Sequence, residues 1–71
     1  MPLKDVSYDL LTALQSKLEA VSAYEIYIED CQENDDDETR QLFDEILRDD
    51  ERHVERLTDR LEQLVKQDQF R

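Results

Sequence analysis

A short acidic segment divides the chain into two halves that share one pattern: Glu33-Asn34-Asp35-Asp36-Asp37-Glu38. On both sides of it, apolar residues recur in alternating steps of three and four, which is the spacing of one face of an α-helix. The first series is Leu11, Leu14, Leu18, Val21, Glu25 and Ile28, and the second is Phe43, Leu47, Asp50, Val54, Leu57, Leu61 and Leu64, so that each series is apolar apart from one acid. The acidic segment is therefore predicted to be a turn between two long helices.

Short carboxylates in the segment suit the start of the second helix. The sequence is compatible with two N-cap pairs, Asp35 with Glu38 or Asp36 with Thr39. Acids at this point also interact favourably with the positive end of the helix dipole. At the other end of the chain, Asp5 suits the start of the first helix.

The expected fold is all-α, an antiparallel hairpin with helices at about 5–33 and 36–68 and an acidic turn at about 34–36. The chain allows a single domain, 1–71, and a domain of this size buries only about 60% of its unfolded surface. Two helices of ~30 residues are each ~45 Å long. Each can bury its apolar face only against the other helix. We therefore expect a homodimer that forms a four-helix bundle.

The composition excludes several classes of function. Twenty acids against nine basic residues give a net charge of −11, which disfavours nucleic acid and anionic lipid as partners. Absent glycine excludes Walker-type and dinucleotide-binding loops, and the single Cys31 excludes an internal disulfide framework. No stretch approaches the roughly 18 apolar residues of a membrane span, and no signal peptide is recognisable. We expect a cytoplasmic protein.

Polar residues interrupt both apolar faces near the middle of the helices. Asp50 falls near the centre of the second face, and His53 lies on its flank. On the first face, Lys17 lies on the flank and Tyr24 lies farther out. Because Lys17 and His53 are each 18 residues from position 35, they are expected at one level. A two-fold axis through this level, with the turns at opposite ends, would gather both copies of Lys17, Asp50 and His53.

The segment around these residues resembles the second metal-binding helix of the ferritin-like superfamily, above all bacterioferritin: Ile46-Leu47-Arg48-Asp49-Asp50-Glu51-Arg52-His53-Val54-Glu55-Arg56-Leu57. That family carries Glu-x-x-His here, and Asp50-x-x-His53 has the same offset with a shorter acid. Tyr24 stands 29 residues before His53, where the family often has a tyrosine beside the site. The similarity runs from about residue 17 to 57, like half of a bacterioferritin. Encapsulated ferritins of this size build a di-iron site from two chains.

The resemblance implies a ferritin-like homodimer with iron at its centre, Asp50 and His53 as metal ligands and Tyr24 next to them. The sequence departs from the family at Lys17, which stands where the first helix should supply a bridging glutamate. An ammonium repels a metal ion and cannot ligate while protonated. The implied site is therefore altered, with a single metal ion or none. Ferroxidase activity, which needs two adjacent metal ions, is not expected.

A second interpretation needs no metal. An ion pair between Lys17 and Asp50, with His53 beside it, would satisfy the polar layer by itself. Such a layer would fix the register of a structural or adaptor dimer that binds an unidentified protein partner.

For Glu25 and for a row of arginines, the sequence allows two interpretations each. Glu25 falls toward the inner face, either to meet a partner's arginine or to lie at the bundle edge. A row of arginines at four-residue spacing follows the second helix: Arg48, Arg52, Arg56 and Arg60. Acids surround the row, so we expect a solvated ladder of ion pairs, with a docking strip for an acidic partner as the alternative.

Overall fold

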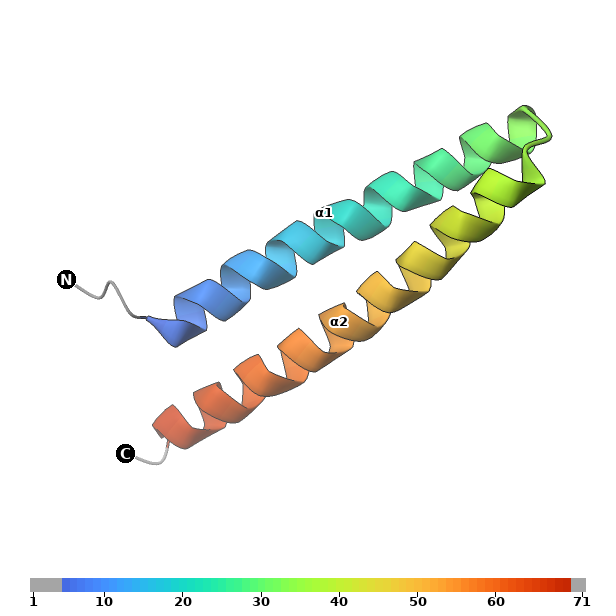
Figure 1. Cartoon of the computed structure of the whole chain (residues 1–71). Helices are drawn as coiled ribbons and strands as arrows, with labels where there is room; N and C mark the ends of the chain where they lie inside the picture. Colours follow the sequence, from blue (N-terminus) through green and yellow to red (C-terminus); the bar gives the residue numbers. More distant parts are fainter. Residues whose placement is uncertain (1–4, 70–71) are drawn as a thin grey trace.

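The computed structural model describes residues 5–69, which form two helices, α1 (Val6–Glu33) and α2 (Asp37–Gln69). The helices lie side by side and run in opposite directions, so that the outer ends of both lie at the end opposite the turn (Figure 1). The predicted all-α helical hairpin is confirmed. No helix within the described range is long and apolar enough to cross a bilayer.

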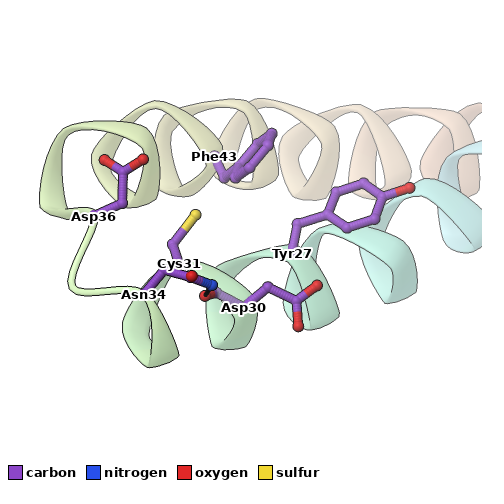
Figure 2. A pocket seen from close by; sticks show the side chains of 6 residues that line it. All are labelled: Tyr27, Asp30, Cys31, Asn34, Asp36 and Phe43. Carbon is purple, nitrogen blue, oxygen red and sulfur yellow. Dashed lines mark hydrogen bonds between the residues drawn. The ribbon is translucent and has the colours of Figure 1, made fainter.

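Aromatic side chains join the two helices near the turn. Tyr24, Tyr27 and Phe43 form an aromatic cluster with ring centroids 5.5–5.8 Å apart, and the Tyr24–Tyr27 pair is edge-to-face. Cys31 follows Tyr27 by one turn and is buried, with its thiol in the space between the helices (Figure 2). This end of the hairpin therefore contains an apolar contact between α1 and α2.

The turn is built from backbone hydrogen bonds at the end of α1. The backbone N–H of Asn34 donates to the carbonyls of Asp30 and Cys31, and its side-chain amide donates to the Asp30 carbonyl at 2.8 Å. Asp35 then adopts φ 54°, the left-handed conformation that glycine usually takes after a helix. Aspartate is one of the few residues that tolerate it, because its short side chain bonds locally.

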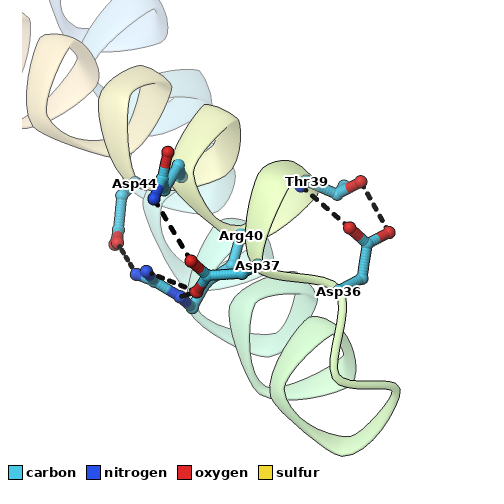
Figure 3. A network of polar contacts seen from close by, with 6 residues as sticks. Asp36, Asp37, Thr39, Arg40 and Asp44 are labelled. Atoms are coloured by element: carbon cyan, nitrogen blue, oxygen red, sulfur yellow. Dashed lines mark hydrogen bonds and ion pairs between the residues drawn. The ribbon is translucent and has the colours of Figure 1, made fainter.

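Asp36 is the N-cap of α2, so the second of the two predicted cap pairs is the one that forms. Its Oδ1 accepts a hydrogen bond from the Thr39 N–H at 3.0 Å, and its Oδ2 accepts one from the Thr39 hydroxyl at 2.7 Å (Figure 3). These bonds hold the pKa of the Asp36 carboxyl below its usual value of 3.8. At the start of α1, Asp5 accepts from the Tyr8 N–H in the same way.

Arg40 links the first two turns of α2. Its guanidinium donates to Asp37 at 2.8 and 3.0 Å and to Asp44 at 2.6 Å (Figure 3). The hydrogen bonds to Asp37 raise the pKa of Arg40 above its usual value. Arg40 therefore compensates part of the negative charge that the acidic segment places at this end.

The hairpin is a thin single layer. Its principal extents are 55 × 22 × 12 Å, and its radius of gyration is 16.3 Å, against about 11 Å for a compact chain of this length. Among residues 5–67, only Cys31 and Asp50 are buried, at 7% exposure each. Large apolar side chains stay exposed along its length: Val6, Tyr8, Leu11, Leu18, Ile26, Tyr27, Leu42 and Val65.

The Asp36 cap gives stability a specific dependence on pH. Because the Asp36 pKa is lower in the folded chain than in the unfolded chain, its contribution is complete above pH 3.8 and is lost as the pH falls through the folded value. We expect Asp36→Ala to lower the urea midpoint at pH 7 by roughly 0.5–1 M. The wild-type and variant midpoints should converge near pH 2.

Asp36→Asn is the matched control, since asparagine also caps helices but does not ionise. Its midpoint should stay close to the wild-type value at pH 7. A difference between wild type and Asp36→Ala that is the same at both pH values would contradict a charged cap.

Candidate functional site

One ion pair joins the two helices within residues 5–69. Lys17 Nζ donates to Asp50 Oδ1 at 2.9 Å, whereas the other ion pairs in this range join residues three or four apart on α2. The Asp50 side chain is 11% exposed and that of Lys17 is 36% exposed. The lysine stem therefore crosses the helix interface while its ammonium keeps contact with water. The structure thus brings together two of the residues that the sequence placed at one level.

His53 lies beside this pair and is not hydrogen-bonded to it. Its Nδ1 is 3.9 Å from Asp50 Oδ1, which is too long for a hydrogen bond. The imidazole is 49% exposed and borders an open groove between the helices. Asp50 and His53 are therefore neighbours on α2, with the histidine on the side that water reaches.

Tyr24 belongs to the aromatic cluster at the turn end. It is half-buried against Tyr27 and Phe43, and no hydrogen bond within the described residues joins it to Asp50 or His53. Its role in this structure is to pack the helix interface. Glu25, the next residue, is exposed in the single hairpin, and its contact with a partner's arginine stays a prediction.

The residues at this level do not fit a di-iron centre. Over residues 5–69, no group of three or more His, Cys, Asp or Glu side chains is arranged to hold a metal ion. The one buried carboxylate, Asp50, already accepts a hydrogen bond from an ammonium. In the same range, every buried side-chain nitrogen and oxygen has a hydrogen-bond partner. Within the single hairpin, the Asp50 carboxylate therefore has its charge partner in Lys17.

The turn end has a second groove, lined by Tyr27, Asp30, Cys31, Asn34, Asp36 and Phe43 (Figure 2). Burial raises the pKa of the Cys31 thiol, and the nearby carboxylates of Asp36 and Asp30 raise it further. A raised pKa keeps the thiol protonated and unreactive at neutral pH. Cys31 is therefore a packing residue. Cys31 follows Tyr27 by four residues and Tyr24 by seven, and this helical spacing was the sequence signal for its burial.

No family model, curated protein or solved structure matches this chain. The ferritin-like resemblance accordingly rests on the Asp50-x-x-His53 segment and the spacing of Lys17 and Tyr24 alone.

The Lys17–Asp50 pair predicts an asymmetry between single and double variants. Lys17→Met leaves a buried carboxylate without its partner, and we expect the free energy of unfolding to fall by about 1–3 kcal/mol. Lys17→Met/Asp50→Leu replaces the whole pair with apolar contacts, and we expect stability within about 1 kcal/mol of wild type. Urea denaturation at pH 7 and one fixed chain concentration measures both.

Lys66→Met is the control, because Lys66 is an exposed lysine of α2. It should change stability by less than about 0.5 kcal/mol. A double variant that is as unstable as Lys17→Met would contradict this account, because it would show that loss of the lysine, and not an unpaired buried carboxylate, determines the effect.

Proposed function

We propose that this chain is a homodimeric helical scaffold, in which two hairpins form a four-helix bundle around a metal-free polar layer. The observation that carries this function is the contact between Lys17 Nζ and Asp50 Oδ1 at 2.9 Å. It places a positive charge on the one buried carboxylate, where a metal-binding bundle would need a further acid.

The exposed surface of the single hairpin supports self-association. The chain exposes 5927 Å², whereas a compact protein of 8.5 kDa exposes about 4,700 Å². The excess of roughly 1,200 Å² is more than the ~800 Å² that each partner buries in an interface of standard size. A second copy is sufficient to cover it, because isologous pairing of two such layers gives a bundle with an enclosed core.

The polar layer would give this bundle its register. Two copies contribute two lysines and two aspartates at the same level, and their formal charges cancel. A layer of this kind tolerates only pairings in which each buried carboxylate keeps its cation, so it disfavours sliding of one helix past another. The dimer would then present a strongly acidic surface through which it acts as a structural or adaptor protein for another protein.

A ferritin-like protein with an altered iron site is the second candidate. Asp50 and His53 lie on neighbouring turns with Nδ1 and Oδ1 3.9 Å apart, and the imidazole is accessible from the groove. Two copies facing each other would bring together two carboxylates and two imidazoles, a donor set that suits one metal ion. Lys17 would have to leave Asp50 for this site to form.

Metal content distinguishes the two functions. We expect the purified protein, after anaerobic loading with Fe²⁺ and desalting, to be a dimer of twice 8.5 kDa by light scattering with no retained iron. Retention of about one or two iron ions per dimer, lost in His53→Ala, would contradict the metal-free layer and support the ferritin-like site.

Lys17→Glu also distinguishes the metal-free scaffold from the ferritin-like site, because it replaces the ammonium with the carboxylate that a metal site would need. In a metal-free layer the variant leaves only acids in a buried position, so the dimer should weaken and added Fe²⁺ or Zn²⁺ should not restore it. A rise in unfolding temperature with either metal would indicate a ferritin-type scaffold that a single residue had disabled. Lys66→Glu, with the same change in charge on an exposed position, is the control.

A further inference from the structure

The net charge of the chain is confined to one half of the hairpin. The turn half, residues 18–52, carries 14 acids and 3 basic residues. The open half, residues 1–17 and 53–71, carries 6 acids and 6 basic residues. The whole charge of −11 therefore belongs to the half that contains the turn, while the half that contains the start of α1 and the end of α2 is neutral (Figure 1).

The open half contains a groove with an apolar floor and a positive rim, here called the cationic groove. Leu10 and Leu57 form the floor, and Arg56 and Arg60 give the rim its positive charge. Lys17, which is paired with Asp50, and the imidazole of His53 also border the groove. Among residues 5–69, neither arginine of the rim pairs with an acid, although Arg60 donates to Gln63 at 3.0 Å. The expected ladder of ion pairs is formed in this range only at Arg52, which contacts Asp49.

The groove at the turn end has the same construction with the opposite charge. Its floor is formed by Tyr27, Cys31 and Phe43, and Asp30 and Asp36 stand at its rim (Figure 2). Here it is called the acidic groove. Both grooves have an apolar floor. The positive charge at the rim of the cationic groove is complementary to the negative charge at the rim of the acidic groove.

The two grooves open on the same face of the hairpin. On α1 they are connected by residues that follow one another in alternating steps of four and three: Ala13, Lys17, Ala20, Tyr24, Tyr27 and Cys31. This spacing keeps all six on one side of a helix. One flat partner can therefore cover both grooves at once.

We infer that a second copy of this chain covers this face in antiparallel orientation, with the acidic turn half of each copy docked along the cationic groove of the other. The inference deepens the proposed homodimer and depends on it. A two-fold axis near the Lys17 level brings opposite charges together twice. A parallel pairing would instead place two turn halves of charge −11 side by side, which like-charge repulsion disfavours.

The orientation is measured by the distance between the two turns. A spin label on Glu38→Cys in a Cys31→Ala chain stands at an exposed position in the first turn of α2. In an antiparallel dimer the labels lie at opposite ends of a molecule 55 Å long, and we expect about 40–50 Å by double electron–electron resonance.

The label distance tests the antiparallel docking, and the mass of the species tests the dimer itself. A distance below about 25 Å in a species of dimer mass overturns the antiparallel docking and leaves the dimer standing. A monomer mass at every chain concentration overturns both. Circular dichroism of the labelled chain, compared with wild type, shows that the helices are intact.

Charge reversal tests the contacts themselves. We expect Arg56→Glu/Arg60→Glu to raise the dimer dissociation constant about tenfold or more in sedimentation equilibrium, because it removes both unpaired arginines from the groove rim. Arg48→Glu/Arg52→Glu is the matched control, with the same spacing and the same change in charge on α2 outside the groove. It should change the constant less than about threefold. An equal effect of the two double variants overturns the docking site.

Discussion

Two helices packed side by side form one layer, and one layer cannot enclose side chains on both of its faces. This constraint explains why an 8.5 kDa chain with regular apolar periodicity buries only Cys31 and Asp50 among residues 5–67. Within residues 5–69 the two helices have no third element to cover them. Apolar residues that remain exposed on the docking face, such as Tyr27, belong to the surface on which the chain can build a core with another molecule.

Within this thin layer, a buried carboxylate needs a partner that reaches it across the helix interface. Lysine suits that position because its apolar stem packs between the helices while its ammonium stays partly hydrated. The contact between Lys17 and Asp50 supplies the charge that the buried carboxylate needs within the single hairpin. In the proposed dimer, two such pairs would make a polar layer whose formal charges cancel.

The hairpin was predictable because apolar spacing and the acidic segment both act locally. The choice of Asp36 as N-cap was left open, since it depends on Asp35 taking a left-handed conformation in a chain without glycine. The neighbour of Glu25 could not be predicted, because this side chain is exposed in the single hairpin and its contacts depend on a second chain. The opposite charges of the two grooves were also missed, because each groove combines residues from both helices.

Dependence of folding on a second copy is tested most directly by thermal unfolding at chain concentrations from about 1 to 100 µM, followed by far-ultraviolet circular dichroism. If the hairpin obtains its core from a second copy, unfolding is coupled to dissociation, and Tm rises steadily with concentration. A Tm that is constant over this range, with a monomer mass, would show that the single layer is stable alone and would contradict the dimer.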